Sequence, residues 1–465
     1  MLAAIIAQPS TDKALQEALK ISSGASLIEL RLDTLTSFIT DDINTCCSKV
    51  SKPIILTYRR TQEGGSYNGN DQIRISRLLS CLIAKPAYLD IEHDLADDLF
   101  RMVINTVAAI SPTTKIIRSY HNLNHTPKNL DSILQSMQNP NIAIYKIVSL
   151  AQKSIDGLTM LDFIQRNNHL NICGHCMGSD GIFTRYLSSI MGSIWSYAAP
   201  NNQNKAIAGI PTINDFNIYR HSSLNNNTSI YALLGDPIDH SKGHIFHNEQ
   251  FSKNNINAIY VKISCDKQSI TPMLSKLSSL PFKGLSITMP LKESVANQGA
   301  YNTMIKIGDT WKYSNTDGPG ACQALLAKTK LAGKSILVLG AGGTARGIIK
   351  ALKQYDCILH IANRTQSKAQ HLKNMFSIKL MDWINIDLTG IDIIISTLHP
   401  EAYLDIKWLS SWSHYICSQH VVMDVNYAVK HSPILQQAAS KNAACIYGED
   451  LFLQQALGQQ QCWQL

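Results

Sequence analysis

Short apolar runs of strand length recur through the first 210 residues and alternate with stretches of helical length. The runs cover residues 3–7, 27–32, 54–58, 88–91, 115–119, 143–148, 170–173 and 206–210. Segments such as 11–20 and 71–83 lie between them and carry apolar residues at helical spacing. Strands that alternate with helices form a parallel sheet. Eight such units predict an α/β fold with an N-terminal (β/α)8 TIM barrel.

A second pattern begins near residue 335. Residues 335–339 are an apolar run of strand length, residues 340–347 are rich in glycine and alanine, and a helical run continues to residue 353. A strand, a glycine-rich turn and a helix in this order are typical of a dinucleotide-binding Rossmann unit. The chain is also too long for one ordinary core. We therefore expect a barrel followed by a two-domain α/β unit.

The clearest change of composition lies at Asn214 to Ser229, where Asn225, Asn226 and Asn227 follow one another and no helical or strand period is present. We expect the linker there, at 216–228. The barrel is then expected at 1–215 and the second unit at 229–465. Within the second unit we expect a substrate domain at 229–320 together with helices at about 440–465, and the dinucleotide-binding domain at 321–439.

Charge and cysteine content narrow the class of protein. The formal net charge is +8, but the lysines and arginines are dispersed, which favours anionic small molecules over nucleic acid as partners. The eleven cysteines are scattered and the N-terminus lacks the layout of a signal peptide, so we expect a cytoplasmic protein. No apolar run approaches the roughly 20 residues of a membrane helix. The oligomeric state is not readable from the sequence.

Polar residues gather where the predicted barrel strands end, and the active face of such a barrel is formed by these ends. They are Glu29, Arg31, Asp33, Arg59, Glu92, His121 and Lys146. The neutral amine of a desolvated lysine can attack a ketone, and a nearby histidine can move the adjacent proton to a departing hydroxyl. Together they predict dehydration of a β-hydroxy ketone. Taken alone, Lys146 could be a structural ion and His121 a packing residue.

Six motifs in the first 215 residues resemble type I 3-dehydroquinate dehydratase. They are Ile-Glu-Leu-Arg-Leu-Asp at 28–33, Tyr-Arg-Arg-Thr-Gln-Glu-Gly-Gly at 58–65, Tyr-Leu-Asp-Ile-Glu at 88–92, Ser-Tyr-His at 119–121, Tyr-Lys-Ile at 145–147 and Met-Gly-x-x-Gly-x-x-x-Arg at 177–185. The resemblance implies that Lys146 forms the imine and that His121 moves the proton. It further implies supporting carboxylates at Glu63 and Glu92, and a substrate clamp of Glu29, Arg31, Arg59 and Arg185.

The chain departs from this family at two positions after the last barrel helix. The family usually has a serine and a glutamine where this chain has Ala206 and Ile210. The loss of two polar contacts is expected to weaken substrate binding without changing the lysine and histidine chemistry. Cys173 and Cys176 form half of a zinc motif, but no second pair follows at zinc-finger spacing, so we expect strand-end packing and no metal.

The glycine-rich turn of the second half predicts which dinucleotide binds. Gly340 permits the tight turn, Gly342 allows the backbone to approach the pyrophosphate, and Ala345 takes the helix-packing position. The next strand, 357–362, is followed by Asn363, Arg364 and Thr365, with Lys368 nearby, and not by the acid that binds a free ribose hydroxyl. Arginine suits a 2′-phosphate, so NADP(H) is favoured over NAD. Alternatively, Arg364 is a solvated loop residue.

The second half resembles shikimate dehydrogenase. The motifs are Leu-Gly-Asp-Pro-Ile-Asp-His-Ser-Lys at 234–242, Gly-Leu-Ser-Ile-Thr-Met-Pro-Leu-Lys at 284–292, Tyr-Asn-Thr at 301–303, Asn-Thr-Asp-Gly at 315–318, Asp-Val-Asn-Tyr at 424–427 and Gly-Glu-Asp-Leu-Phe-Leu-Gln-Gln at 448–455. The resemblance implies a catalytic pair of Lys292 and Asp317, which alone would be a weak surface ion pair. It implies substrate contacts from Ser241, Ser286, Thr288, Asn302, Tyr427 and Gln455. It implies cofactor contacts from Gly340, Ala341, Gly342, Gly343, Thr344, Ala345, Asn363, Arg364, Thr365, Lys368 and Gly448.

Two features qualify the second resemblance, and several alternatives stay open. Gly243 stands where the family has a serine beside the substrate carboxylate, which leaves open substantial quinate dehydrogenase activity. The stretch from Lys292 to Asn302 looks short, which predicts a trimmed helix. The first half could instead be a class I aldolase, and one half could be a degenerate scaffold. The leading expectation is a bifunctional shikimate-pathway enzyme that makes 3-dehydroshikimate and reduces it to shikimate.

Overall fold

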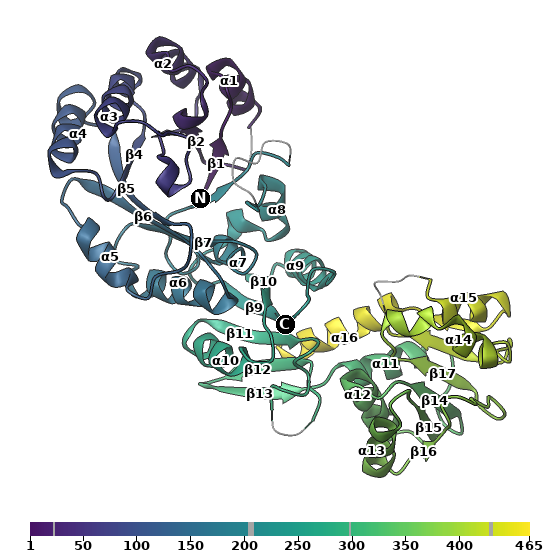
Figure 1. Cartoon of the computed structure of the whole chain (residues 1–465). Coiled ribbons are helices and arrows are strands. Elements are labelled where there is room, and N and C mark those ends of the chain that lie inside the picture. The colour runs from purple at the N-terminus through teal and green to yellow at the C-terminus, as the bar shows by residue number, and fades with distance from the viewer. Residues whose placement is uncertain (22–23, 203–208, 297–298, 427–430) are drawn as a thin grey trace. The chain divides into compact units, whose positions relative to one another are not determined.

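The structure is a computed structural model that describes the chain except for residues 22–23, 203–208, 297–298 and 427–430 (Figure 1). Its first part is a parallel sheet of eight strands in the order β7-β6-β5-β4-β3-β2-β1-β8. The strands are β1 Leu2–Ile6, β2 Leu27–Arg31, β3 Ile54–Thr57, β4 Tyr88–Glu92, β5 Lys115–Asn122, β6 Ile142–Leu150, β7 Ile172–Met177 and β8 Ser196–Ala198. A 2.9 Å bond from Ile194 N to Ile172 O links the two edges. The predicted α/β barrel is confirmed, in a nearly closed form.

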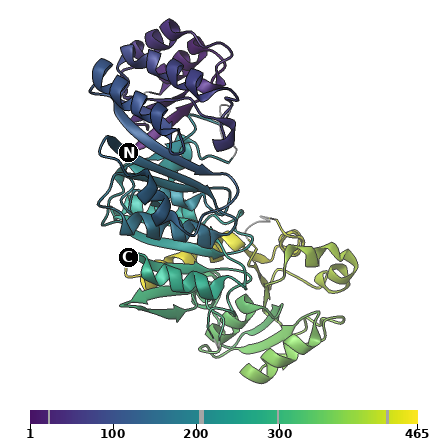
Figure 2. The same cartoon turned by 60° about the vertical axis from the view of Figure 1, so that its left-hand side comes forward.

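Helices cover the outside of the barrel strands, as two directions of view show (Figures 1 and 2). They are α1 Thr11–Lys20, α2 Thr40–Lys49, α3 Asp71–Ser80, α4 Asp97–Ile110, α5 Leu130–Met137, α6 Ser154–Arg166 and α7 Phe183–Leu187. Short 3-10 turns lie at η1 Leu32–Thr34, η2 Thr61–Glu63 and η3 Cys81–Ala84. Helix α3 illustrates the local rules, because Asn70 caps its first turn and Ile75, Leu78 and Leu79 form its buried face.

The eighth barrel strand is not where the sequence predicted it. The strand that pairs with β1 is β8, in the register Ala3↔Tyr197, whereas the prediction was 206–210. Residues 203–208 lie outside the described part of the chain, and Ile210 is buried in the barrel core without being in a strand. Trp195 and Tyr197 pack in the barrel core. The prediction missed this strand because these two aromatic residues lie in a short run that contains two serines and no continuous aliphatic stretch.

The segment after the barrel is more ordered than its composition indicated. Helix α8 Ile213–Ile218 begins with a capping box, in which Thr212 and Asp215 bond each other's backbone N–H groups, and η4 His221–Ser223 follows it. Phe216 and Tyr219 are buried, and both rings contact Tyr186 of α7. The segment around the expected linker therefore contains short helical elements. A short capped helix with two buried rings is too brief to produce a visible period.

The chain forms two compact units by its backbone contacts. The first comprises Met1–Tyr231, His244–Cys265 and Pro272–Pro281, and the second comprises Ala232–Gly243, Asp266–Thr271 and Phe282–Leu465. A five-stranded sheet has the order β10-β9-β11-β12-β13. Its elements are β9 Ser229–Gly235, α9 Gly243–Lys253, β10 Ala258–Ser264, α10 Ile270–Ser279, β11 Phe282–Ile287, β12 Thr303–Ile307, β13 Thr310–Ser314 and α11 Asp317–Leu326. Strands β11, β12 and β13 are antiparallel neighbours.

The third sheet is parallel and has six strands in the order β16-β15-β14-β17-β18-β19. Its elements are β14 Ser335–Leu339, α12 Gly343–Leu352, β15 Ile358–Ala362, α13 Gln366–Phe376, β16 Lys379–Leu380, β17 Ile393–Ser396, η5 Pro400–Leu404, α14 Ile406–Ser413, β18 Val421–Asp424, α15 Pro433–Ser440, β19 Ala444–Ile446 and α16 Gly448–Cys462. In β14, Ile336 and Val338 enter one hydrophobic core, whereas Leu337 and Leu339 enter another. Burial on both faces explains its continuous apolar run.

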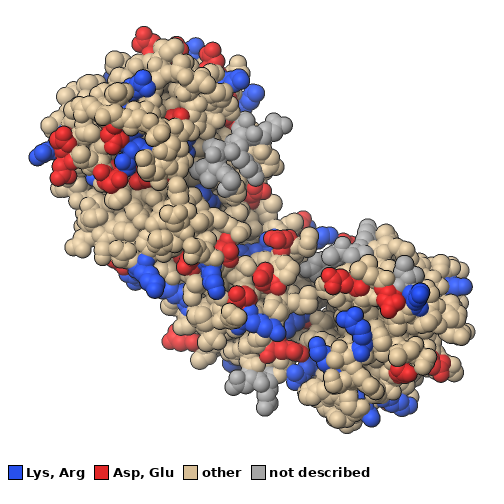
Figure 3. Space-filling view, in the orientation of Figure 1, with Lys and Arg blue, Asp and Glu red and all other residues tan. Residues whose placement is uncertain are grey.

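The surface agrees with the dispersed charge expected from the sequence. On the face drawn in Figure 3, lysine and arginine side chains are interspersed with aspartate and glutamate. None of the described helices is long and apolar enough to span a bilayer. The eleven cysteines are all free thiols.

Candidate active sites

Lys146 lies inside the barrel between two carboxylates. It extends from β6, and its Nζ is 3.1 Å from Glu29 Oε1 on β2 and 2.9 Å from Asp90 Oδ2 on β4. Alternate residues of each barrel strand point inward, which brings these three side chains together from separate strands. The side chain of Lys146 is only 5% exposed, so its charge is held by paired carboxylates and not by solvent.

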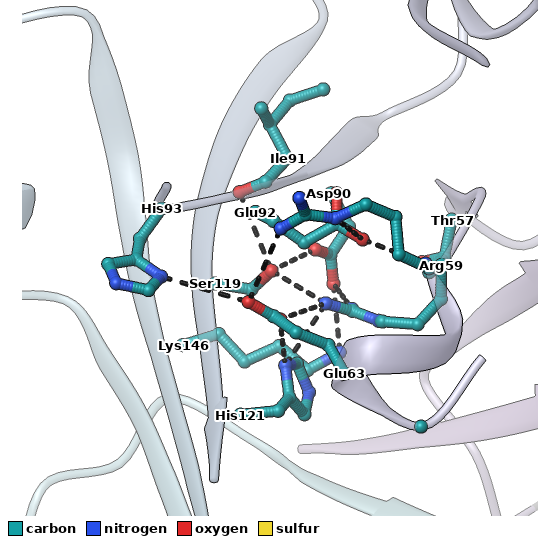
Figure 4. A network of polar contacts seen from close by, with 12 residues as sticks. Thr57, Arg59, Glu63, Asp90, Ile91, Glu92, His93, Ser119, His121 and Lys146 are labelled. Atoms are coloured by element: carbon teal, nitrogen blue, oxygen red, sulfur yellow. Dashed lines mark hydrogen bonds and ion pairs between the residues drawn. The ribbon is translucent and has the colours of Figure 1, made fainter. Parts of the chain in front are cut away.

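Arg59 connects the groups around Lys146 (Figure 4). Its guanidinium is 2.7 Å from Asp90, 3.2 Å from Glu63, 2.8 Å from Ser119 Oγ and 3.0 Å from His121 Nδ1. Burial alone would raise the pKa of Asp90, but Arg59 and Lys146 hold it well below its usual range. The same balance lowers the pKa of Glu63, through His121, His93 and Arg59. The carboxylates of this network are therefore charged.

His121 is held in a neutral state beside Lys146. Burial and the nearby charge of Arg59 lower its pKa to about 4. Its Nδ1 is 2.9 Å from Glu63 Oε2. When Nδ1 carries the hydrogen and donates it to Glu63, Nε2 keeps a free lone pair. A neutral imidazole of this kind is able to accept a proton at neutral pH.

Arg185 differs from the other arginines of the barrel because no carboxylate among the described residues forms an ion pair with it. It extends from α7, is 3% exposed, and donates to the backbone oxygen of Tyr197 at 3.5 Å. Burial lowers its pKa to about 10. Arg31, in contrast, grips Asp33 through two bonds of 2.9 and 2.8 Å. A buried cation without an ion-pair partner favours binding of an anion.

These side chains line a cavity of about 110 Å³. Its lining includes Glu29, Arg31, Arg59, Glu63, His121, Lys146, His175, Arg185 and Tyr197. Glu92, in contrast, is outside the lining, because it forms an ion pair with Arg74 and accepts from the backbone N of Arg60 at 3.1 Å. The structure thus brings the predicted barrel residues together around one cavity, with the exception of Glu92. Glu92 instead bonds Arg74 and the backbone of Arg60 outside the cavity lining.

Two groupings in the barrel could be mistaken for metal sites. Glu63, His93 and Asp94 lie close together, but Glu63 already contacts Arg59 and His121, and Asp94 contacts Arg60. Ion pairs therefore account for this group. Cys173 and Cys176 both lie on β7, where the thiol of Cys173 contacts Trp195 O and that of Cys176 contacts Ser149. Residues three apart on a strand point to opposite faces, so these two thiols do not converge.

The second half places Lys292 and Asp317 in contact. Asp317 begins α11 and its carboxylate receives a short hydrogen bond from Lys292 Nζ. Asn302 Nδ2 donates to Asp317 Oδ1 at 2.7 Å and to Gln455 Oε1 at 3.1 Å. The pair is 14% and 8% exposed, which excludes an ordinary surface ion pair. Lys292 also donates to Thr344 Oγ1 at 3.1 Å, which links it to the glycine-rich turn.

The remaining predicted substrate contacts have different positions. Ser286 on β11 donates to Gln459 Oε1 at 3.0 Å, and Thr288 follows the same strand. Ser241 Oγ accepts the N–H of Gly243 at 3.3 Å, at the start of α9. A trimmed helix was expected after Lys292, but among residues 288–302 the described ones form turns, with Val295 N bonded to Leu291 O.

The glycine-rich turn has the geometry that the sequence predicted. Gly340 has a φ of +105°, and a Cβ there would lie 2.4 Å from Thr397 Oγ1, so the position requires glycine. Gly342 caps α12 and has open space where a Cβ would be, while Ala345 is fully buried. Gly343 and Thr344 open α12, and Ala341 precedes it. Exposed backbone at a helix N-terminus is a ready site for a phosphate.

The residues after β15 are exposed where a ribose phosphate is expected. Asn363 bonds the backbone oxygen of Thr365 at 2.9 Å and so shapes the turn into α13. Arg364 and Lys368 are exposed and extend from this turn and from the first turns of α13. Gly448 is buried at the first position of α16. The site thus combines an open helix N-terminus with two cations and no carboxylate at the end of β15.

Comparisons with known proteins agree with both sites. Family models match residues 2–225 as type I 3-dehydroquinase, 233–301 as a shikimate dehydrogenase substrate binding domain and 323–427 as shikimate / quinate 5-dehydrogenase. The shikimate biosynthesis protein AroDE of Chlamydia pneumoniae is 31% identical over 480 residues, which cover 100% of this chain and 95% of that protein. The chain belongs to the AroDE family. The bifunctional 3-dehydroquinate dehydratase/shikimate dehydrogenase of Arabidopsis thaliana is 27% identical, over 99% of this chain and 81% of that protein.

Similar solved structures cover either one half or the whole of this chain. A shikimate dehydrogenase in complex with NADP+ is 27% identical over 52% of this chain and 91% of that one, with a TM-score of 0.48. The dehydroquinate dehydratase and shikimate dehydrogenase part of AroM from S. pombe is 22% identical over 99% of this chain and 95% of that one, with a TM-score of 0.43.

Sequence reasoning missed several residues of the two sites. Asp90 and Ser119 lie two residues before Glu92 and His121, and the same strand alternation would have found them. Gln459 lies one helical turn after Gln455 on α16, and its Nε2 donates to Asn302 O at 3.2 Å. Tyr197 was missed because β8 was misplaced.

Three positions named in the sequence analysis remain, namely Tyr427, Ala206 and Ile210. Tyr427 and Ala206 lie outside the described residues. Ile210 is 2% exposed and packs in the barrel core with Ile5 and Ile144. An apolar side chain in that position offers no hydrogen bond to a ligand.

Proposed function

We propose that this chain dehydrates 3-dehydroquinate in the barrel through an imine at Lys146 and reduces the resulting 3-dehydroshikimate to shikimate with NADPH in the second half. The proposal assigns residues 1–215 to the dehydratase, 216–228 to a linker and 229–465 to the dehydrogenase. The observation that carries it is that the buried amine of Lys146 and the neutral imidazole of His121 line the same cavity. A cytoplasmic location stays a prediction from the sequence.

Dehydration begins with the amine of Lys146, after it has lost a proton, adding to the substrate ketone. Water leaves, and a protonated imine forms that withdraws electrons from the neighbouring carbon. His121 then takes a proton from that carbon, and the electron pair expels the β-hydroxyl, which leaves as water with a proton returned by His121. Hydrolysis of the imine releases the product and the free lysine. Glu63 holds the imidazole in the required orientation through Nδ1.

Arg185 is the group best suited to the substrate carboxylate. Arg31 and Arg59 are already paired with carboxylates, whereas Arg185 has no ion-pair partner among the described residues. A bidentate bond from Arg185 to a carboxylate would satisfy a charge that is otherwise buried alone. Arg31 and Arg59 then act mainly on the shape and the electrostatic potential of the cavity. Of the three arginines in the predicted substrate clamp, only Arg185 is proposed to bind the carboxylate directly.

In the second half, Lys292 is proposed to donate a proton to the carbonyl oxygen and Asp317 to orient it. Asn302 donates to the other oxygen of the Asp317 carboxylate, and Gln455 accepts from the same amide of Asn302. NADPH, when bound, supplies the hydride. The open helix N-terminus at Gly342 fits its pyrophosphate, and Arg364 and Lys368 fit a 2′-phosphate. Ser286 and Thr288 at the end of β11 are proposed to hold substrate hydroxyls, and Ser241 the carboxylate.

The proposal is tested by mixing the purified chain with 3-dehydroquinate and NADPH. Consumption of NADPH with accumulation of shikimate is expected, since the first product is the second substrate. Separate assays with 3-dehydroquinate alone and with 3-dehydroshikimate plus NADPH assign a failure to one half. A chain that turns over neither substrate would contradict the proposal, and a chain active in only one assay would show that the other half is a scaffold.

A further inference from the structure

His175 is a buried polar side chain in the barrel cavity that the proposed mechanism does not use. It lies on β7, opposite Val148 in the register with β6, and two residues beyond Cys173, the partner of Lys146. It therefore stands one inward position further along the barrel than the imine lysine. The side chain is 3% exposed and lines the same cavity as Lys146, His121 and Arg185.

The imidazole of His175 lacks a hydrogen-bond partner. Its Nδ1 is buried, and no described residue bonds it. The ring packs against that of Tyr197, with centroids 5.9 Å apart and planes tilted by 54°. Leaving a buried polar group unsatisfied is costly, and such groups are rare in folded proteins. A bound molecule would supply the missing partner.

The charges around His175 decide its chemical state. Burial and the nearby charges of Arg185 and Lys146 lower its pKa well below the usual value, so the ring is neutral. A neutral imidazole donates one hydrogen bond and accepts one. A hydroxyl group has the same complementary pattern, whereas a carboxylate only accepts.

We propose that His175 binds a ring hydroxyl of the dehydratase substrate and so helps to position the ring against Lys146. This inference rests on the proposed dehydratase activity. The substrate carboxylate is assigned to Arg185 and the ketone to Lys146, which leaves the hydroxyls as the groups that a neutral donor and acceptor would hold. His175 makes no bond to reacting atoms in this proposal, so it acts on binding.

The first test compares three substitutions by the KM and kcat for 3-dehydroquinate. His175→Leu removes both nitrogens at similar volume, and we expect KM to rise about 10-fold with kcat within about threefold. His175→Asn and His175→Gln present an amide near the positions of Nδ1 and Nε2. At least one of them is expected to keep KM within about threefold of the parent. His169→Leu, at an exposed histidine just before β7, is the matched control and should change neither constant.

A purely structural role would give a different result. Replacing an unsatisfied buried nitrogen by an apolar group is neutral or stabilising, so His175→Leu would then leave KM unchanged. That outcome overturns the inference. An equal rise of KM in all three variants also overturns it, because the defect would then be one of packing. In every variant, a kcat for dehydration within about threefold of the parent verifies that the barrel is folded. Reduction of 3-dehydroshikimate by the same chain verifies the second half.

The second test identifies the hydroxyl. Parent and His175→Leu are compared on analogues of 3-dehydroquinate that each lack one ring hydroxyl. The rise of KM caused by His175→Leu should disappear for one analogue and persist for the others. An analogue that lacks the hydroxyl bound by His175 has already lost this contact in the parent. A penalty that is the same for every analogue overturns the inference. Parent turnover of 3-dehydroquinate and borohydride trapping at Lys146 are measured first, so failure of the dehydratase function itself is recognised separately.

Discussion

The barrel site and the dehydrogenase site hold their catalytic lysines in different ways. Lys146 is closed inside a sheet and lies between two carboxylates that other strands present. Lys292 lies in a turn after β11 and contacts Asp317 on one side and Thr344, at the start of α12, on the other. The first lysine is held by other strands of one barrel, from residues 117 and 56 positions away in sequence. The second is held by the starts of two helices, from residues 25 and 52 positions away.

The difference follows from the chemistry that each lysine is proposed to perform. A lysine that forms a covalent imine needs its neighbours within one closed cavity, since amine, base and substrate must keep fixed distances through several steps. A lysine that donates a proton during reduction needs contact with both substrate and cofactor. Its link to Thr344 in the glycine-rich turn is consistent with that requirement. Rigid walls suit the first task, and an accessible helix N-terminus suits the second.

The sharpest way to separate the two sites is to remove each lysine in turn. Lys146→Ala should abolish dehydration, by on the order of 10^4-fold or more, because the nucleophile is lost. Reduction of 3-dehydroshikimate by the same protein should be unchanged. Lys292→Ala should show the reverse pattern, with reduction lowered by roughly 10^2- to 10^4-fold. Steady-state rates with each substrate measure both effects.

A control is needed because Lys146→Ala leaves Glu29 and Asp90 short of one cation. Lys146→Arg keeps the positive charge but offers no neutral amine, so it should be as inactive as Lys146→Ala while unfolding at a temperature closer to that of the parent. Borohydride with 3-dehydroquinate should trap an adduct at Lys146 in the parent. Normal dehydration by either variant would refute the imine assignment.

Cofactor selectivity tests the exposed cations of the dehydrogenase site. Arg364→Asp should lower kcat/KM for NADPH by about 10- to 100-fold and that for NADH far less, because a carboxylate would then face the 2′-phosphate. Lys368→Asp tests whether the neighbouring cation shares this role and should give a smaller effect. Equal losses with both cofactors would show that Arg364 only shapes the turn.

The two sites were not equally readable from the sequence. Period-two alternation at strand ends located Glu29, Arg31, Arg59, His121 and Lys146, because a residue on a barrel strand faces either the cavity or the helices. The same rule did not find Tyr197, since β8 was assigned to the wrong run. Ion pairing within the wall also could not be read, and for this reason Glu92 was grouped with Glu63 as a supporting carboxylate, although Glu92 pairs with Arg74 outside the cavity lining.

In the dehydrogenase half, the glycine-rich turn was readable because one local backbone geometry requires it, as the φ of Gly340 illustrates. The support of the catalytic pair was harder to find. Asn302 and Gln455 are separated by more than 150 residues, and only tertiary packing reveals that α16 returns to β12. Gln459 was therefore missed, although helical spacing from Gln455 would have indicated it once α16 was known to line the site.

Acid should weaken the barrel before the dinucleotide-binding part. Burial lowers the pKa of His121 and His221 to about 4 and that of His175 well below its usual value, while histidines of the unfolded chain titrate near 6.5. The unfolded barrel therefore binds more protons between these values, and its free energy of unfolding falls as pH drops from about 6.5 towards 4. His121 and His221 each contribute up to about 2 kcal/mol of this loss at pH 5.

Hydrogen exchange of peptides from β1–β8 and from β14–β19, corrected for the intrinsic pH dependence, measures this difference. In the dinucleotide-binding part His360 has a lowered pKa but is partly exposed, so a smaller loss is expected there. His221→Phe should reduce the slope in the barrel, because a phenyl ring keeps the contact with Phe216 without titrating. Equal slopes in both parts would mean that the buried histidines do not govern acid stability.

The smallest expected effect concerns Gly243 and the choice between shikimate and quinate. Gly243 is buried at the first position of α9, and its N–H donates to Ser241, the residue proposed to bind the substrate carboxylate. Quinate differs from shikimate by a hydroxyl on the ring carbon that bears the carboxylate. Space beside that carbon cannot strongly exclude an added hydroxyl, so we expect measurable quinate oxidation with NADP, below that of shikimate.

Gly243→Ser should lower the quinate-to-shikimate ratio of kcat/KM by about fivefold. Gly243→Ala adds volume without a hydroxyl, and a similar decrease there would assign the effect to volume alone. A ratio that neither substitution changes, or a parent without any quinate turnover, would mean that other residues close the pocket.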